Sequence, residues 1–263
     1  GLSNAGLGSD LLLANECVDP ARLAELAALD ARVTVAVDSF ETVDAVARAG
    51  VREVLVDVSV GLPRCGCEPD QAEALAERAR RAGLTVRGVM GYEGHIVGEP
   101  NRERREAGCA EAMERLRPAH EAVGGEVVSA GGTGTYRCNS FATEIQAGSY
   151  AVMDTAYAKL GLPFQQAVFL LATVISVSEG YAVCDAGLKS LSIDHGDPEI
   201  VGGRVWFCSD EHITFSMENP PKVGDRVRID PSHCDPTIAV HPVMHGVEGE
   251  AIVERFEVDL RGW

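Results

Sequence analysis

The apolar positions of the first 160 residues form short, nearly continuous runs, separated by stretches with a helical repeat. The runs are rich in β-branched residues, as is typical of strands that are buried on both faces of a parallel sheet. Pro20 stands where one helix would begin, and Gly50 and Gly83 stand where two others would end. The pattern predicts strand units at 10–16, 32–38, 53–60, 84–92, 126–132 and 143–154. Such a β-α alternation indicates an α/β barrel or a doubly wound sheet.

The residues that follow these predicted strands are polar or are glycines. In both candidate folds, ligands bind at the carboxyl ends of the strands. We therefore expect a ligand-binding face that contains Asn15–Glu16, Asp38–Ser39, Gly61–Arg64, Tyr92–His95, Gly131–Thr135 and Ser149–Tyr150.

The pattern changes after about residue 165. Long helical repeats disappear, and strand-like segments follow one another between Gly and Pro turns. We predict two domains, an α/β domain at 1–162 and an all-β domain at 163–263.

Charge and cysteine usage narrow the possible partners and surroundings. The formal net charge is −17, which argues against nucleic acid and anionic membranes as partners because phosphates would be repelled. There is no apolar run of about 18 residues, and the first ten residues do not resemble a signal peptide. Only Cys65 and Cys67 of the eight cysteines are close in sequence. We expect reduced thiols and a cytoplasmic protein.

A glycine-rich segment, GGTGTY at 131–136, follows a predicted strand. Glycines let the backbone approach a ligand closely, and backbone N–H groups and threonine hydroxyls together bind phosphate. At neighbouring strand ends, Arg64 is a candidate partner for a carboxylate or a cofactor oxygen. Tyr92 is a candidate for a contact to a ring, and His95 for a proton transfer.

A His-Cys-Asp triplet lies between two prolines near the end of the chain, in PSHCDPT. In an extended segment His233 and Asp235 would share one face and Cys234 would point away. An imidazole and a carboxylate that converge are suitable ligands for a divalent metal. A polar turn between strands is the alternative. His212, 21 residues earlier, is a candidate to approach the pair.

Taken together, these segments resemble the D-threonine aldolase and D-serine dehydratase family. These are alanine-racemase-like enzymes of fold-type III that use pyridoxal 5′-phosphate (PLP). The matching segments occur in family order along the whole chain: LLLANE, the residues around Arg64, GYEGH, SAGGTGTY, EIQAGSY, DAGLKSLSID, SDEH and PSHCDPT.

The resemblance implies a (β/α)8-type PLP-binding barrel followed by a β domain, and usually a homodimer. It implies that Arg64 and Tyr92 line the cofactor ring, and that His233 and Asp235 are the catalytic metal ligands, which engage the β-hydroxyl of the substrate. It also implies that the cofactor phosphate is held by Gly132, Thr133, Gly134, Thr135, Ser149 and Tyr150.

The second metal ligand favours one activity over another. Family dehydratases resemble this site with a cysteine and zinc, whereas a carboxylate such as Asp235 suits manganese or magnesium. We therefore expect an aldolase that cleaves D-threonine or a related D-3-hydroxy amino acid to glycine and an aldehyde. The alternatives are a D-serine dehydratase or 3-hydroxy-D-aspartate lyase, a non-catalytic PLP-binding homologue, and a metal-dependent barrel lyase without PLP.

The chain departs from the family pattern at its start. The family's Schiff-base lysine lies on the first barrel strand, but the three lysines here are Lys159, Lys189 and Lys222, and none has that context. A barrel needs eight strands and six are predicted. We expect that two N-terminal strands with the lysine are absent, and that this chain alone is inactive as a PLP enzyme.

Overall fold

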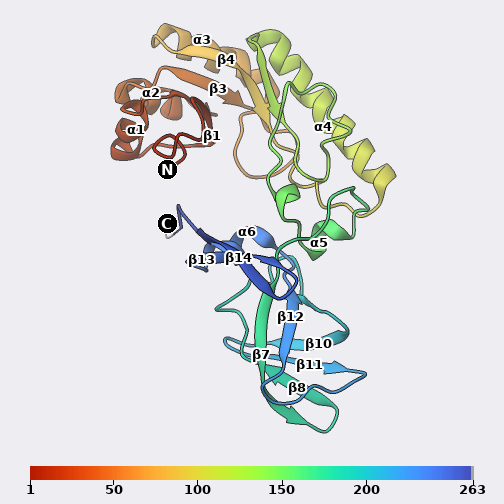
Figure 1. Ribbon diagram of the computed structural model, residues 1–263. Coiled ribbons are helices and arrows are strands. Elements are labelled where there is room, and N and C mark those ends of the chain that lie inside the picture. Colours follow the sequence, from red (N-terminus) through yellow and green to blue (C-terminus); the bar gives the residue numbers. More distant parts are fainter. Residues whose placement is uncertain (262–263) are drawn as a thin grey trace. The chain divides into compact units, whose positions relative to one another are not determined.

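The chain forms two compact units, Gly1–Gly148 and Ser149–Trp263 (Figure 1). The structure, a computed structural model, describes residues 1–261. Residues 149–162 belong to the second unit because they bond to it: the Thr155 N–H donates to the carbonyl of Pro231 at 3.0 Å. The change between the two units thus comes 14 residues before the position expected from the sequence pattern.

The first unit is built on a parallel sheet of six strands in sequence order. The strands are β1 (Asp10–Glu16), β2 (Arg32–Val37), β3 (Glu53–Asp57), β4 (Thr85–Gly91), β5 (Val127–Ala130) and β6 (Glu144–Ile145). The prediction of six parallel strands is confirmed.

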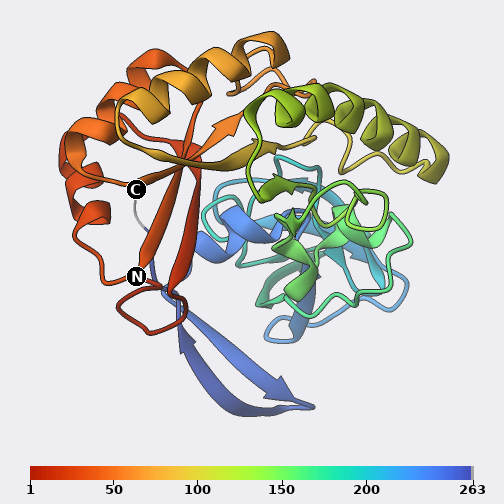
Figure 2. The same cartoon turned by 90° about the horizontal axis from the view of Figure 1, so that it is seen from above.

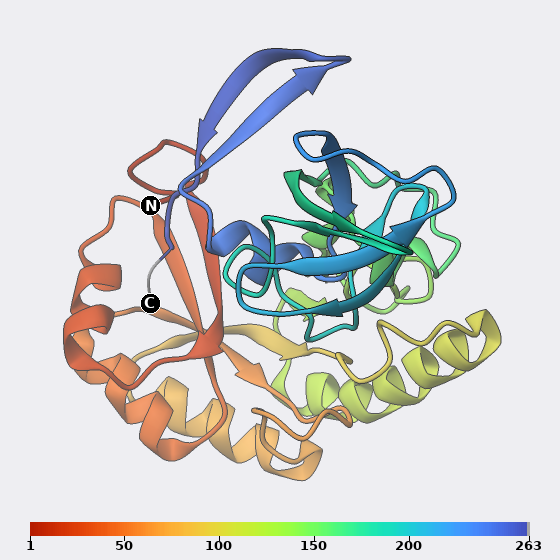
Figure 3. The ribbon, with the colours of Figure 1, turned by 90° about the horizontal axis from the view of Figure 1, so that it is seen from below.

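Helices cover one face of this sheet, as Figures 2 and 3 show. They are α1 (Pro20–Ala27), α2 (Phe40–Ala49), α3 (Ala72–Arg81) and α4 (Arg102–Val123). Local sequence fixes their ends: Ser39 caps α2 through its side chain, and Gly50 ends it in the left-handed conformation. Alternate strand residues such as Val35, Val54 and Val89 are fully buried in the core beneath the helices.

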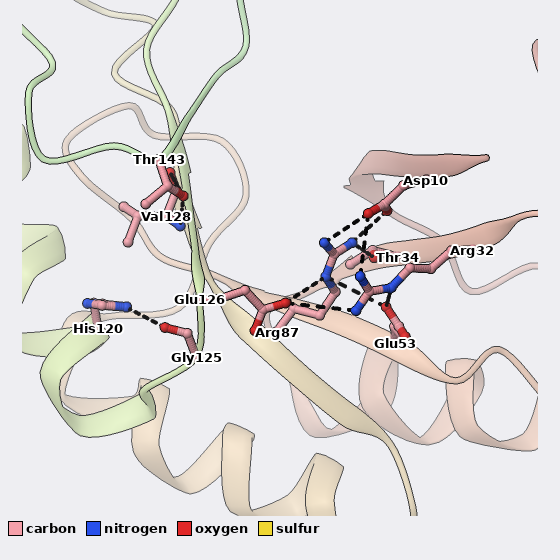
Figure 4. A network of polar contacts seen from close by, with 10 residues as sticks. All are labelled: Asp10, Arg32, Thr34, Glu53, Arg87, His120, Gly125, Glu126, Val128 and Thr143. Atoms are coloured by element: carbon pink, nitrogen blue, oxygen red, sulfur yellow. Dashed lines mark hydrogen bonds and ion pairs between the residues drawn. The ribbon is translucent and has the colours of Figure 1, made fainter. Parts of the chain in front are cut away.

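Charged side chains occupy the amino ends of the strands (Figure 4). Arg87 donates to Asp10 at 2.7 Å and to Glu126 at 3.3 Å, while Arg32 donates to Glu53 at 2.6 Å. A cavity of about 240 Å³ lies beside this network, lined by Asp10, Leu12, Thr34, Leu55, Arg87, Val127 and Glu144. The network binds four strands to one another at the end of the sheet opposite the predicted ligand-binding face.

The second unit is a mostly antiparallel β structure. Its six-stranded sheet has the order β10-β11-β8-β7-β12-β9. The strands are β7 (Leu170–Ser178), β8 (Tyr181–Cys184), β9 (Glu199–Ile200), β10 (Gly203–Cys208), β11 (Ile213–Met217) and β12 (Arg226–Asp230). Phe215, Ile213 and Ile229 are fully buried in its core. The prediction of a β domain without long helices is confirmed.

Three short helical segments and a hairpin complete this unit. They are η2 (Ser149–Ala151), α5 (Thr155–Ala158), α6 (Cys234–Ala239), and the strands β13 (Val243–Glu248) and β14 (Ala251–Glu257), which form a long ribbon (Figure 3). The sequence prediction of a strand unit at 143–154 is wrong beyond Ile145, because the chain turns into η2. No helix within residues 1–261 is both long and apolar enough to cross a bilayer.

Candidate functional site

The glycine-rich segment forms a buried turn directly after β5. Gly131 has φ +79°, a conformation that favours glycine. The Thr135 N–H donates to the carbonyl of Gly132 at 3.1 Å, and the Gly132 N–H donates to the hydroxyl of Thr135 at 3.0 Å. Thr133 and Thr135 are 2% and 0% exposed. The turn therefore has a fixed shape that its own residues maintain.

Gly134 is the position where this turn has no room for a side chain. A Cβ atom there would lie 1.7 Å from the carbonyl oxygen of Val97. The residue is buried, and its backbone N–H has no hydrogen-bond partner among residues 1–261. A buried unpaired donor in a glycine turn suits an anion such as phosphate.

Glu93, which follows β4, holds this turn in place. Its side chain is fully buried and accepts hydrogen bonds from the Gly131 N–H at 3.0 Å and from the Asn139 amide at 3.1 Å. The thiol of Cys109 in α4 lies 3.9 Å from the same carboxyl group. The sequence places Glu93 in the predicted ligand-binding face but gives it no role, because a charged residue beside Tyr92 gives no sign of being buried.

Arg64 and Tyr92, which the sequence predicts as neighbours of a cofactor ring, lie against each other. The guanidinium carbon of Arg64 is 5.3 Å from the centre of the Tyr92 ring. The Tyr92 ring also reaches the glycine turn, since a Cβ on Gly132 would lie 3.2 Å from Tyr92 Cε2. His95, the other candidate on this loop, packs against Gly61 instead. The structure thus brings three of the predicted cofactor residues together.

Acidic side chains gather at the carboxyl ends of the first three strands. Ligand atoms of Glu16, Asp38 and Cys65 lie within 4.8 Å of one another. Burial, and then the charge of Glu16 and a hydrogen bond with it, raise the pKa of Asp57 to about 8. A hydrogen bond with Glu16, together with burial, raises the pKa of Cys65 to about 11. Asp57 therefore holds a proton at neutral pH, at the edge of the sheet where ligands bind in such folds.

In the second unit, His233 and Asp235 lie side by side. Nε2 of His233 is 3.6 Å from Oδ2 of Asp235. This spacing is beyond a hydrogen bond, but it suits two ligands of one ion with bonds of about 2.1 Å. The expectation that the segment is extended is wrong. Its helix, α6, begins at Cys234, and Pro236 is tolerated there because the first helical turn needs no N–H donor.

Cys234 faces the interior. It is fully buried, and its N–H donates to Asp154 Oδ2 at 3.0 Å. Burial, and then the charges of Asp235 and Asp154, raise the pKa of its thiol to about 12. The thiol donates to Oδ1 of Asp235 at 3.5 Å, on the buried side of that carboxylate.

Two residues beside His233 extend this group. Oδ2 of Asp194 is 2.8 Å from Nδ1 of His233, and the His195 ring stacks on the His233 ring at 3.9 Å. Among the described residues, the group of three possible ligands that contains His233 consists of Asp194, His195 and His233, and it includes neither Asp235 nor His212. Sequence reasoning missed His195, although the dipeptide Asp194-His195 was a usable signal.

Ser149 and Tyr150, the other predicted phosphate residues, lie in the second unit within η2. The Ser149 carbonyl accepts the Met153 N–H at 2.7 Å, and the Tyr150 ring is 5.4 Å from that of Phe164. Lys189 is exposed and pairs with Glu211 at 2.7 Å. The phosphate role of Ser149 and Tyr150 stays a prediction.

Two family models match the chain. Residues 1–156 match the alanine racemase, N-terminal domain, and residues 167–247 match the putative serine dehydratase domain. They meet near the boundary between the two compact units.

Three relatives are similar over most of the chain. The 3-hydroxy-D-aspartate aldolase of Paracoccus denitrificans (strain Pd 1222) is 33% identical over 96% of this chain and 74% of that protein. The D-threo-3-hydroxyaspartate dehydratase of Delftia sp. (strain HT23) is 28% identical over 86% of this chain and 72% of its own length. The crystal structure of D-threonine aldolase from Filomicrobium marinum has a TM-score of 0.91 at 32% identity, covering 97% of this chain and 77% of that one.

The family model over residues 1–156 and the structural match place the chain in the alanine-racemase-like class of PLP proteins. Within that class, the chain belongs to the family of D-threonine aldolases and 3-hydroxyaspartate aldolases, PLP-dependent lyases whose relatives include a dehydratase.

Proposed function

We propose that this protein is a PLP- and divalent-metal-dependent aldolase that cleaves D-threonine or a related D-3-hydroxy amino acid. The observation that carries this proposal is the pairing of His233 Nε2 with Asp235 Oδ2 at 3.6 Å, with the thiol of Cys234 turned into the core. A histidine and an exposed carboxylate thereby lie where one ion would reach both, while the sulfur of Cys234 is buried behind Asp235. The similarity to a 3-hydroxy-D-aspartate aldolase and to a D-threonine aldolase supports the same activity.

The first unit is proposed to hold the cofactor. The unpaired N–H of Gly134 and the buried turn around it fit a phosphate group, and Arg64 with Tyr92 would contact the ring. When bound, PLP supplies an electron sink for the bond that breaks at the substrate α-carbon. Residues 1–148 contain no lysine, so the parallel sheet of this unit supplies the phosphate and ring contacts but no Schiff-base lysine.

The second unit is proposed to hold the metal through His233 and Asp235. A carboxylate ligand favours manganese or magnesium over softer ions. A divalent ion at this place would polarise the substrate β-hydroxyl and ease the loss of its proton. In the aldolase reaction that proton leaves, the Cα–Cβ bond breaks to give acetaldehyde from D-threonine, and the α-carbon takes up a proton to give glycine.

Product analysis on the complete protein tests this proposal. With PLP and Mn²⁺ added, D-threonine should give equimolar glycine and acetaldehyde, while D-serine should give little pyruvate or ammonia. Removal of the metal with a chelator should stop the reaction, and Mn²⁺ should restore it. Pyruvate and ammonia from D-serine as the main products would overturn the aldolase assignment.

A dehydratase is the second candidate. It is favoured by the 28% identity to the D-threo-3-hydroxyaspartate dehydratase of Delftia sp.. In that case the β-hydroxyl would leave as water, and the α-amino group would follow as ammonia. D-threo-3-hydroxyaspartate separates the candidates, because an aldolase converts it to glycine and glyoxylate and a dehydratase converts it to oxaloacetate and ammonia.

A non-catalytic PLP-binding homologue is a further alternative, because residues 1–148 contain no lysine. Such a homologue would bind PLP through the glycine turn but turn over neither amino acid. The proposed homodimer and cytoplasmic location are separate predictions, and sedimentation velocity on the complete protein measures the first of them.

A further inference from the structure

Side chains lie next to both ring nitrogens and one face of the His233 imidazole. Nδ1 lies 2.8 Å from Oδ2 of Asp194, and Nε2 faces Oδ2 of Asp235 at 3.6 Å. The ring of His195 stacks on one face at a centroid distance of 3.9 Å and an interplanar angle of 9°. The ring is therefore held in plane and in direction before any ion binds.

The contact with Asp194 determines which nitrogen carries the proton. An ionised carboxylate can only accept a hydrogen bond, so Nδ1 must be the donor. In the neutral imidazole, Nε2 then carries the lone pair, and this is the nitrogen that faces Asp235. A carboxylate that accepts from the non-ligating nitrogen of a metal-bound histidine is a recurring way to fix the tautomer and raise the basicity of the ligand.

The structure also holds Asp194 itself. Oδ1 of Asp194 accepts a hydrogen bond from the Ser192 hydroxyl, whose oxygen in turn accepts the Asp194 N–H at 3.3 Å. Both oxygens of the Asp194 carboxylate are thereby engaged, Oδ1 by Ser192 and Oδ2 by His233.

The loop that carries Asp194 is bonded to the segment that carries His233. Ser232 donates to the carbonyl of Gly196 at 2.6 Å, and the Ser192 N–H donates to the hydroxyl of Thr237 in α6 at 3.1 Å. The loop and the start of α6 are thereby fixed to each other on both sides of the imidazole. This is a built arrangement rather than a chance contact between two exposed side chains.

We propose that Asp194 is a positioning residue that presents Nε2 of His233 to the divalent metal, with the His195 ring stacked behind it. The inference rests on the proposed function, because it assigns Asp194 a role only if His233 binds the ion. A direct role for Asp194 as a ligand would require the ion to replace the hydrogen in the 2.8 Å contact with Nδ1. The open 3.6 Å gap on the Nε2 side is the better place for it.

Nitrogen NMR of the imidazole tests the tautomer directly. In the ¹⁵N-labelled chain, at a pH where the imidazole is neutral, His233 should be protonated at Nδ1 and unprotonated at Nε2. It should keep the Nδ1 proton when Zn²⁺ is added as a diamagnetic probe. In Asp194→Ala, the metal-free His233 should shift toward the tautomer that is protonated at Nε2. Metal at Nδ1 with the proton at Nε2 in the wild type, or an unchanged tautomer in Asp194→Ala, would overturn the proposal.

Mn²⁺ binding, measured by calorimetry on the same chain, gives the second readout. Asp194→Ala should weaken Mn²⁺ about 10- to 100-fold. Asp197→Ala, the same change in the same loop, should bind Mn²⁺ as the wild type does. Equal affinity in Asp194→Ala and the wild type would contradict the positioning role.

A third variant separates this inference from the proposed function. His233→Ala should lose Mn²⁺ binding altogether. If it binds Mn²⁺ like the wild type, the metal site of the proposed function fails, and the role of Asp194 fails with it. If only Asp194→Ala retains wild-type affinity, the metal site stands and the positioning role alone is wrong.

Discussion

The two candidate sites, one in each unit, are built in opposite ways. The glycine turn of the first unit relies on buried groups: Glu93 and Thr135 are fully buried, and their hydrogen bonds are made within the protein. In the second unit, the side chains of Asp194 and Asp235 are 52% and 69% exposed, and only that of His233 is mostly covered, at 19%. Buried polar groups must form their hydrogen bonds within the protein, whereas exposed ligands are hydrated until an ion binds.

This difference shows which of the two sites has its final shape before a ligand binds. The glycine turn has its final shape before a phosphate arrives, since a substitution at Gly134 would clash with backbone atoms. The His233 site combines a histidine held by Asp194 with the exposed carboxylate of Asp235, whose Oδ1 accepts from the Cys234 thiol. We therefore expect substitutions in the second unit to act mainly by removing a metal ligand. Substitutions in the first unit should act mainly by changing the shape of the glycine turn.

The largest effect should follow from Asp235→Ala. Because a metal at this site contributes several kcal/mol to the transition state, the metal-dependent activity of the complete protein should fall about 10³-fold or more. The thermal unfolding temperature should hardly change, since the side chain is exposed. Steady-state rates with D-threonine across a Mn²⁺ titration measure the effect. Full activity of Asp235→Ala would remove the contrast between the two sites.

Glu93→Ala should instead change the shape of the glycine turn. It leaves the Gly131 N–H and the Asn139 amide without their acceptor, which should destabilise the first unit by about 3 kcal/mol. PLP should then bind more weakly, as followed by quenching of protein fluorescence. Glu111→Ala, an exposed change in α4, is the matched control and should alter neither property. An unaltered affinity for PLP in Glu93→Ala would mean that the turn keeps its shape without this anchor.

Asp57→Asn tests the first unit through the pH dependence of its stability. The folded-state pKa of Asp57 is about 8, far above that of an unfolded aspartate, so the folded protein retains a proton that the unfolded chain releases. This contribution to stability is fully present below about pH 4 and is lost as pH rises toward 8, with a slope of up to about 1.4 kcal/mol per unit.

Urea unfolding at pH 5, 7 and 9 measures that slope. The wild-type free energy of unfolding should fall over this range, and the fall should be smaller in Asp57→Asn. Parallel curves for the two proteins would show that Asp57 ionises normally.

The smallest effect should come from Cys234→Ala. The thiol is fully buried, and its contact with Asp235 is to Oδ1 at 3.5 Å rather than to Oδ2, which faces His233. The affinity for Mn²⁺ should therefore stay within about twofold of the wild type, at a stability loss of about 1 kcal/mol from the small cavity. Calorimetry with Mn²⁺ checks the first value and urea unfolding the second. A large loss of affinity would move the second ligand from Asp235 to Cys234 and the favoured metal toward zinc.

The sequence predicted the sheet of the first unit well for a physical reason. Strands such as β1 and β2 are bounded by polar residues and covered by helices whose caps, Asp19 and Ser39, are visible in the sequence. The strand β6 was overestimated because only two of its residues pair with a neighbour. The hairpin β13–β14 was not predicted from the sequence. Every residue of β14 is exposed, so the strand has no buried face that an apolar pattern would mark.

The candidate sites were predictable only in part. Arg64 and Tyr92 follow strands that lie next to each other, so their contact follows from topology. The pairing of His233 with Asp235 was expected for the wrong reason, since a helix start rather than an extended strand brings them together. Glu93 and His195 act through burial and stacking, which depend on tertiary contacts that no local pattern records.

The inward position of Cys234 bears on how the protein would endure oxidants. A thiolate ligand in an oxidising environment is converted stepwise to sulfenic and sulfinic acids and then releases its metal. The paired His233 and Asp235 cannot follow that course, and the protonated, buried sulfur of Cys234 reacts slowly. A centre of this composition should therefore keep its ion through exposure to peroxide or to thiol alkylating reagents, conditions that would inactivate a relative whose ligand is a cysteine.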